Sequence, residues 1–393
     1  MQEMSSGSRA RNGRYAQCAE IEPTIRFSPR VEHTCDRADE ETLFVAALSH
    51  VKRPRRRGDN LHRQARIGHR ARRRQGYPCA LDLDIMPEIQ HSLAGTDFSA
   101  RADLAVERAA LLARQHRATL HLLHAMPNLP WRMFGRVLVE NPLVTETRLH
   151  ESARERLLLT AQALRDRYGI AVRAHTFMGR AHEQIAEYAR SQAVDLTVLG
   201  SHGENFVRDL FVGATALKTL KHGIDNALIV RPGSLDAGGY RSVLVAVDFS
   251  GSSLPAVEAA LRLAPQACVQ LLHVYEVGFE GKMRYAGVDD DVIRRYREAA
   301  ADEARRAAEQ LLAAIPERDR ISVEIKHGNP ARNILDHARL LGTDLIVMGK
   351  RGSAEIDRLL LGSVTQHVLD ETDRDVLLVA PPEQASDNPA RAG

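Results

Sequence analysis

Three glycines in the stretch VMGKRGSAEIDRLLLGSVTQHVL (residues 347–369) have the residue type and spacing that could bind a phosphate group. Gly349 and Gly352 follow an apolar run of strand length, and Gly362 precedes Ser363 at the start of a helical pattern. Glycine lets the main chain approach a ligand closely, and the amides at a helix N-terminus bind anions. Alternatively, the first two glycines only form a turn, and Gly362-Ser363 only caps a helix. The residues alone leave both interpretations open.

The spacing of these glycines excludes two common phosphate-binding loops. A Walker A loop needs G-x-x-x-x-G-K-[ST] and a dinucleotide fingerprint needs G-x-G-x-x-G, whereas this stretch reads G-x2-G-x9-G-S. The histidines and the 4 cysteines form no zinc-ligand spacing or disulfide framework, and no G-x-S-x-G nucleophile elbow is present. The sequence therefore predicts neither a metal site nor a serine nucleophile.

The glycine pattern occurs twice in the chain. VDLTVLGSHGENFVRDLFVGATALKTL (194–220) aligns with residues 343–369 at an offset of 149, and upstream TDFSA aligns with VDFSG at an offset of 151. The alignment pairs Gly200 with Gly349, Gly203 with Gly352, Gly213 with Gly362, His124 with His273, Asp195 with Asp344, and Asp97 with Asp248. A period this long indicates duplicated domains and not a solenoid.

Apolar runs alternate with helical patterns within each copy. In the second copy, we expect strands over RSVLVAVD, CVQLLHV, ISVEIKHG, DLIVMG and DVLLVAP, and helices over SLPAVEAALRLAP, VDDDVIRRYREAAADEARRAAEQLLAAI, ARNILDHARLLG and SVTQHVLDE. Continuous Val/Ile/Leu strands separated by helices indicate a parallel sheet covered on both faces. The predicted fold class is α/β, with two tandem open parallel five-stranded sheets. Ligands bind beyond the carboxyl ends of such strands, and Gly349 lies at one of these ends.

The two predicted domains do not include a basic N-terminal extension. We expect an extension at 1–85, domains at 86–233 and 241–381, a linker at 234–240 and a tail at 382–393. The extension holds 17 Lys+Arg against 11 Asp+Glu, whereas the rest of the chain holds 37 against 40. It could neutralise phosphates on nucleic acid, be disordered, or not be translated at all, because Met86 directly precedes an apolar strand. We favour the last two and expect no nucleic-acid partner.

No apolar stretch of the sequence is long enough to span a membrane, and the N-terminus has no secretory signal pattern. We therefore expect a cytoplasmic protein with no membrane partner.

Both copies resemble the universal stress protein family, in its tandem two-domain form, over about residues 88–381. The resemblance depends on G-x2-G-x9-G-S together with AVDFS after the first strand and LLHV in the second. It implies a Rossmann-like fold, also found in adenine nucleotide alpha hydrolases, and a regulatory stress-response protein that binds ATP, with Mg²⁺ held by the phosphates. The family commonly pairs through the last strand of the domain. The two copies could therefore form a pseudo-dimer within the chain, and a homodimer is also open.

The resemblance also implies roles for individual residues of the second copy. Asp248 would lie beside the adenosine, and the main chain of Val274 would hold the adenine edge. The implied nucleotide-binding set is completed by Met348, Gly349, Gly352, Gly362, Ser363, Val364 and Thr365. Asp248 could instead cap the helix after Phe249, and we expect His273 to be a satisfied core histidine. Lys350 and Arg351 could add positive charge for the phosphates, but we favour solvated loop residues.

The first copy departs from the family pattern. Ala214 stands where Ser363 stands in the second copy, Thr215 comes one position late, and Glu204 and Asp209 add negative charge to the loop. A doubtful second site of Asp97, Gly200, Gly203 and Gly213 is therefore expected to bind nucleotide weakly or not at all.

Three classes of function stay open on the sequence: a nucleotide-binding stress protein, a slow ATPase, and a structural partner that binds no nucleotide. Phosphoryl transfer usually needs a residue that positions water or an acceptor, and no catalytic pair of that kind is evident near the loop. The sequence does not give the direction of the Glu355 and Asp357 side chains. We favour the first class.

Overall fold

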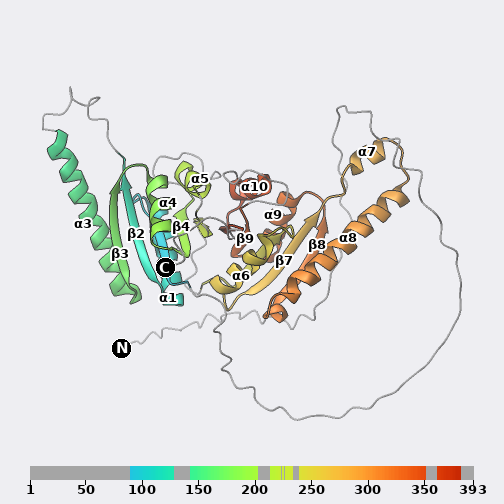
Figure 1. Ribbon diagram of the computed structural model, residues 1–393, viewed down its shortest axis with the longest axis horizontal. Coiled ribbons are helices and arrows are strands. Elements are labelled where there is room, and N and C mark those ends of the chain that lie inside the picture. Colours follow the sequence, from blue (N-terminus) through green and yellow to red (C-terminus); the bar gives the residue numbers. More distant parts are fainter. Residues whose placement is uncertain are drawn as a thin grey trace, which may run out of the picture. The chain divides into compact units, whose positions relative to one another are not determined.

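The computed structural model describes residues 89–127, 142–201, 213–222, 224, 226–232, 239–350 and 361–381, with side chains from Thr147 onward in the helix that starts at residue 142. Two copies of one αβ unit occupy this part of the chain, which we call repeat 1 (89–232) and repeat 2 (239–381) (Figure 1).

Repeat 1 contains β1 (His91–Gly95), α1 (Ala100–His116), β2 (Thr119–Met126), α3 (Pro142–Tyr168), β3 (Val172–Met178), α4 (Ala181–Ser191), β4 (Leu196–Gly200), α5 (Ala214–Lys221) and β5 (Asn226–Val230). Repeat 2 contains β6 (Ser242–Val247), α6 (Ser253–Leu263), β7 (Cys268–Tyr275), α7 (Glu280–Tyr285), α8 (Asp290–Ala313), β8 (Ile321–His327), α9 (Pro330–Leu341), β9 (Leu345–Gly349), α10 (Ser363–Glu371) and β10 (Asp375–Val379), with a 3₁₀ turn at Arg318–Arg320 before β8. Every strand and helix predicted for the second copy is present, and the short helix α7 is an addition.

The strands form one ten-stranded sheet in the order β3-β2-β1-β4-β5-β10-β9-β6-β7-β8. All neighbouring strands are parallel except β5 and β10, which pair antiparallel, with Leu377 opposite Leu228. The predicted α/β class and the five parallel strands of each copy are confirmed, but the two sheets are continuous. The apolar runs NALIV and DVLLV pair with each other, so that neither is left as an uncovered edge.

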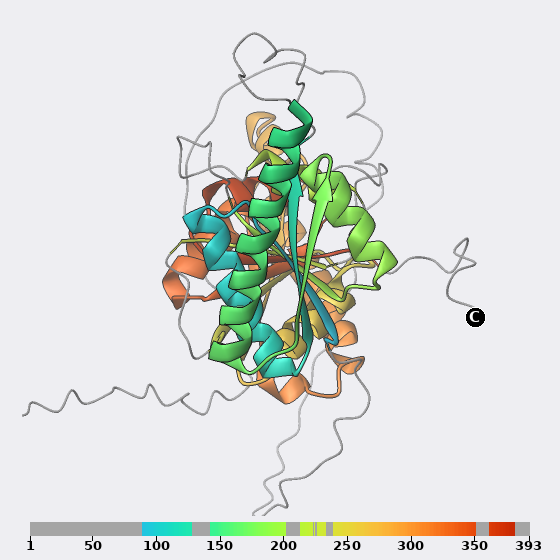
Figure 2. The same cartoon turned by 90° about the vertical axis from the view of Figure 1, so that its left-hand side faces the viewer.

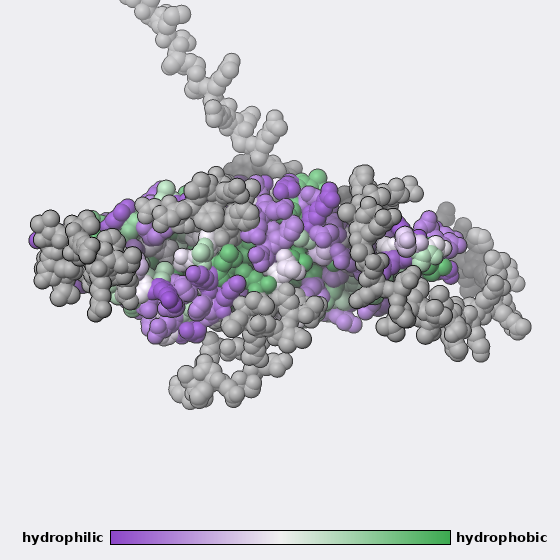
Figure 3. Space-filling model, turned by 90° about the horizontal axis from the view of Figure 1, so that it is seen from above, coloured by the Kyte–Doolittle hydropathy of each residue, from purple (hydrophilic) through white to green (hydrophobic). Residues whose placement is uncertain are grey.

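Helices lie on both faces of this sheet (Figure 2), and an apolar core fills the space between the helices and each face. Buried residues of α1, α3 and α6 pack on one face, and those of α4, α5, α9 and α10 pack on the other. Because buried side chains alternate between the faces of a strand, β1 sends Ala94 to the first core and Leu93 to the second. Both hydrophobic and hydrophilic residues reach the surface when the described part is seen from above (Figure 3).

The strand order reverses at the same place in each repeat. The chain passes from β6 to β7 on one side and returns to β9 on the other side of β6, and β1, β2 and β4 do the same. The carboxyl ends of β6 and β9, and of β1 and β4, are therefore the switch points where such folds bind ligands.

Candidate functional site

The predicted phosphate loop of repeat 2 starts and ends at the switch point. β6 and β9 are paired with Ala246 opposite Met348, so Asp248 and Gly349 follow neighbouring strand ends. The amide of Gly362 donates to the carbonyl oxygen of Lys350 at 2.9 Å, which brings the start of α10 back to the end of β9. Gly352 lies outside the described residues.

A side-chain hydrogen bond fixes α10 to the same strand end. Thr365 is only 3% exposed, and its hydroxyl donates to the carbonyl oxygen of Gly349 at 3.0 Å. The side chains of Met348 and Val364 lie in the apolar core, so only their main chains face this edge of the sheet. Ser363, the first residue of α10, is exposed, and the first turn of α10 contains no acidic residue. The helix therefore presents amides and a hydroxyl, with no carboxylate to repel an anion.

Asp248 and the residue after it form a tight turn at the end of β6. The Asp248 carboxylate accepts hydrogen bonds from the amide of Ser250 at 3.0 Å and from the hydroxyl of Ser253 at 3.4 Å. Phe249 has a φ of 59°, a left-handed conformation that is strained for an aromatic residue. Asp248 therefore forms a turn before α6 and does not cap this helix, whose N-cap is Ser252, and the Asp248 side chain is exposed to solvent.

His273 lies under this turn. Its ring packs on Phe249 with a centroid distance of 4.4 Å, and Nδ1 donates to the carbonyl oxygen of Val247 at 2.8 Å. Burial lowers the pKa of His273 below its usual value. The prediction of a satisfied core histidine is confirmed. Val274 follows it in β7 opposite Lys326, half-buried against the second core.

The first repeat reproduces this geometry. The Asp97 carboxylate accepts from the amide of Ser99 at 3.0 Å, Phe98 has a φ of 62°, and its ring lies 4.4 Å from that of His124. His124 donates to the carbonyl oxygen of Thr96 at 2.8 Å. The left-handed conformation of this phenylalanine was not predicted from the sequence. Its only sequence signal is the tripeptide Asp-Phe-Ser, which occurs at 97–99 and again at 248–250.

The loop of the first repeat is closed at its base in the same way as the second. The amide of Gly213 donates to the carbonyl oxygen of Ser201, and α5 starts at the exposed Ala214. A Cβ on Gly200 would lie 3.1 Å from the carbonyl oxygen of Arg101, so close packing against α1 already accounts for this glycine. Gly203, Glu204 and Asp209 lie outside the described residues. The described parts of the two sites share a backbone and differ in side chains at the helix start, where Ala214 and Ala216 of repeat 1 correspond to Ser363 and Thr365 of repeat 2.

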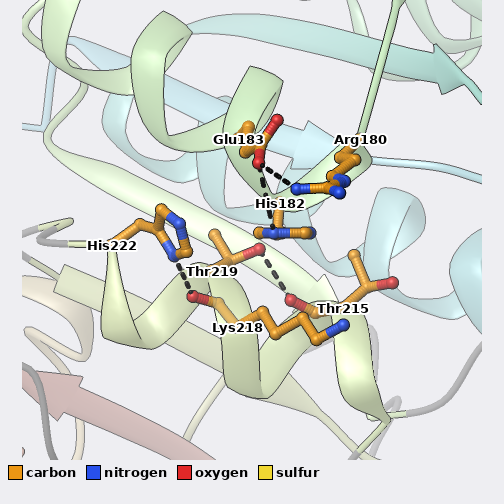
Figure 4. A network of polar contacts seen from close by, with 7 residues as sticks. All are labelled: Arg180, His182, Glu183, Thr215, Lys218, Thr219 and His222. Carbon is orange, nitrogen blue, oxygen red and sulfur yellow. Dashed lines mark hydrogen bonds and ion pairs between the residues drawn. The ribbon is translucent and has the colours of Figure 1, made fainter.

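Polar side chains of α4, α5 and their flanking residues lie side by side in repeat 1 (Figure 4). The rings of His182 and His222 lie edge to face at 5.0 Å, and burial together with His222 lowers the pKa of His182. Glu183 accepts from Arg180 at 3.1 Å and lies 3.9 Å from His182. Repeat 2 has Ala331 in place of His182, so this network distinguishes the two repeats.

The expectation of a solvated Lys350 is wrong. Lys350 is 3% exposed, and its ammonium donates to the carbonyl oxygen of Ile224 in repeat 1. Its amide donates to Val379 at 2.9 Å. Sequence reasoning missed this contact because the partner is a main-chain carbonyl far away in the chain. Arg351, Glu355 and Asp357 lie outside the described residues.

Among the described residues, no helix is long and apolar enough to cross a membrane. In the same part of the chain, no three His, Cys, Asp or Glu side chains are grouped so that they could hold a metal ion.

The fold and the paired loops define a doubly wound α/β protein with two repeats. The model of the universal stress protein family matches residues 88–231 and 239–380, one match for each repeat. The chain belongs to this family, as its glycine spacing predicts.

Several relatives and solved structures are similar to parts of this chain. Universal stress protein MJ0531 of Methanocaldococcus jannaschii is 27% identical over 173 residues, which cover 43% of this chain and 96% of the relative. The crystal structure of a universal stress protein from Archaeoglobus fulgidus covers 74% of this chain and 98% of its own, with a TM-score of 0.52 at 16% identity, and so supports the fold alone. A universal stress protein solved in complex with cAMP is 27% identical and covers 36% of this chain and 97% of its own, with a TM-score of 0.25.

Proposed function

We propose that this protein binds ATP at the switch point of repeat 2 and that repeat 1 binds it weakly or not at all. The observation that carries the proposal is the start of α10. Ser363 and the first helical turn are held beside Gly349 by the Gly362–Lys350 and Thr365–Gly349 hydrogen bonds. Such a helix end favours a phosphate through its N-terminal amides and its dipole.

The remaining groups fit the adenosine end of the same ligand. Asp248 is exposed at the end of β6, beside the end of β9, where its carboxylate could accept from ribose hydroxyls. Val274 lies one strand further along the same edge. We propose that any Mg²⁺ is held by the phosphates themselves, as Mg²⁺ commonly is in nucleotide sites.

The replacement Ser363→Asp tests this proposal because its two effects have opposite signs. A carboxylate in the first turn interacts favourably with the helix dipole by about 0.3–1 kcal/mol, so the protein without ligand should be at least as stable as the wild type. The same charge repels the triphosphate, and we expect ATP to bind about tenfold more weakly or not at all.

Ala214→Asp is the matched control, since Ala214 is the exposed first residue of α5 in repeat 1. It makes the same chemical change at the corresponding helix, and we expect ATP affinity to stay unchanged. Calorimetric titration with ATP, with cAMP as a comparison ligand, measures both variants. Wild-type ATP affinity in Ser363→Asp would show that α10 does not hold the phosphates.

ATP hydrolysis is a separate question that binding does not answer. Release of more than one phosphate per chain would identify an ATPase, whereas we propose a regulatory nucleotide-binding protein.

A further inference from the structure

A group of charged side chains is buried where β5 of repeat 1 meets β10 of repeat 2. Asp375 is 0% exposed and Arg108 is 1% exposed, with 3.4 Å between Arg108 Nε and Asp375 Oδ2. The Tyr240 hydroxyl donates to the same carboxylate oxygen at 2.6 Å, and the Arg231 amide donates to the other one at 2.8 Å. Asp375 is therefore satisfied by donors from both sides of the junction.

Each repeat supplies charges that the other repeat completes. Arg108 on α1 and Arg231 after β5 belong to repeat 1, whereas Asp375 and Tyr240 belong to repeat 2. The Arg231 guanidinium donates to the carbonyl oxygen of Leu369 in repeat 2. The Arg108 guanidinium also lies over the Tyr240 ring at 4.5 Å from its centroid. A buried ion is costly to leave without its partner, because its hydration is lost and nothing replaces it. Removal of either half of the junction would therefore leave a buried charge without its partner.

The two repeats carry different residues at the equivalent positions of this junction. In the alignment of the two repeats, Arg108 corresponds to Ala259, Asp375 to Asn226, Arg231 to Ala380 and Lys350 to Ser201. The β5–β10 pairing is close to twofold symmetric, with Leu228 and Leu377, themselves an aligned pair, facing each other. The backbone would therefore let either repeat pair with a second copy of itself, and only the side chains differ.

Pairing like with like would bury these charges without their partners. Two copies of repeat 1 would enclose Arg108 and Arg231 with Asn226 in place of the carboxylate. Two copies of repeat 2 would enclose Asp375 with Ala259 in place of the guanidinium. We infer that the buried Arg108–Asp375 contact makes this strand edge specific for the other kind of repeat, so that it joins repeat 1 to repeat 2 and rejects a homotypic dimer. Within one chain the linker keeps the correct partner at high effective concentration.

Two charge reversals on full-length chains test the inference. Arg108→Asp sets two carboxylates against each other, and Asp375→Arg sets two guanidinium groups against each other, so each variant alone should pair its repeats poorly. When the two variants are mixed, reciprocal exchange restores both contacts. The new carboxylate meets the new guanidinium, while the native Asp375 of one chain meets the native Arg108 of the other.

We expect native mass spectrometry of differently mass-labelled chains to show a heterodimer of the two variants that is absent when either one is mixed with itself. Arg114→Asp and Asp336→Arg serve as controls, because Arg114 is an exposed residue of α1 and the Asp336 side chain, on α9, is 62% exposed. Mixing these controls should give no heterodimer. The inference fails if both charge-reversal variants keep the wild-type assembly state and unfolding midpoint and do not associate on mixing.

A milder variant covers the case in which the reversed chains do not fold. Arg108→Ala, Arg231→Ala and Asp375→Asn together install in each repeat the residue of the other at these positions and remove the three buried charges. This chain should fold and should form homotypic dimers whose amount rises with concentration. A triple variant that matches the wild type in assembly state at every concentration would also contradict the inference.

Discussion

Replacing Thr365 with valine tests how the phosphate loop is held in shape. The Thr365 hydroxyl is buried and donates to the carbonyl oxygen of Gly349 at 3.0 Å. Valine has nearly the same shape, so no cavity forms, but the hydrogen bond is lost and the carbonyl oxygen loses a partner. A buried hydrogen bond of this kind contributes about 1 kcal/mol, and we expect the free energy of unfolding to fall by about 1–2 kcal/mol.

The same bond positions the first turn of α10 relative to Gly349, so its loss should also weaken ATP binding. If about 1 kcal/mol of positioning is lost, the Kd for ATP rises about fivefold. Urea unfolding measures the first effect, and calorimetric titration measures the second.

Thr219→Val provides the matched control in repeat 1. Its hydroxyl is equally buried and donates to the carbonyl oxygen of Thr215 at 2.8 Å, one helical turn earlier in α5. That carbonyl oxygen keeps its helical amide donor, so we expect a smaller loss of stability and no change in ATP affinity. The reasoning is refuted if Thr365→Val alters neither quantity, or if Thr219→Val weakens ATP binding as much.

Two further predictions concern the free energy of unfolding. Burial, with smaller effects of His91, Arg173 and His175, lowers the pKa of His121 to about 4, and burial next to Lys326 lowers the pKa of His337 to about 4. The unfolded chain takes up these protons at a higher pH than the folded chain, so the free energy of unfolding should fall as the pH drops from about 6.5 toward 4, by about 2 kcal/mol per histidine at pH 5. His121→Gln installs the residue of repeat 2 and should remove the contribution of His121 to this loss, as measured by urea titrations at pH 7.5 and 5. Asp344→Asn weakens the hydrogen bonds from the amides of Arg241 (2.8 Å) and Ser242 (2.9 Å), so the free energy of unfolding should fall by about 1–2 kcal/mol. Calorimetry should show unchanged ATP affinity, because this carboxylate lies at the amino end of β9, away from the nucleotide site at its carboxyl end.

Local sequence patterns were sufficient to predict the five strands of repeat 2 and its helices other than the short α7. The apolar run DLIVMG predicted β9, and the start of α10 at Ser363 followed from a glycine before a hydroxyl residue. The interpretation of His273 also held, because a histidine among apolar strand residues needs a hydrogen-bond partner, which the carbonyl oxygen of Val247 provides. These features depend on neighbours close in the chain or on the period of the strand.

Features that depend on distant contacts were not predictable in the same way. Lys350 looks like a loop lysine in the sequence, and only its contact with Ile224 in the other repeat explains its burial. Arg108 stands among alanines and gives no sign of Asp375, which lies on the other side of the junction. The left-handed Phe249 depends on the turn that Asp248 forms and on the ring of His273 beneath it. No periodic pattern encodes any of these contacts.

The number of ATP molecules bound by one wild-type chain tests the central claim most directly. Isothermal titration calorimetry of the full-length protein should give one ATP per chain, and Ser363→Asp should abolish or greatly weaken that binding. Two equivalent sites per chain, or no binding of ATP at all, would contradict the account.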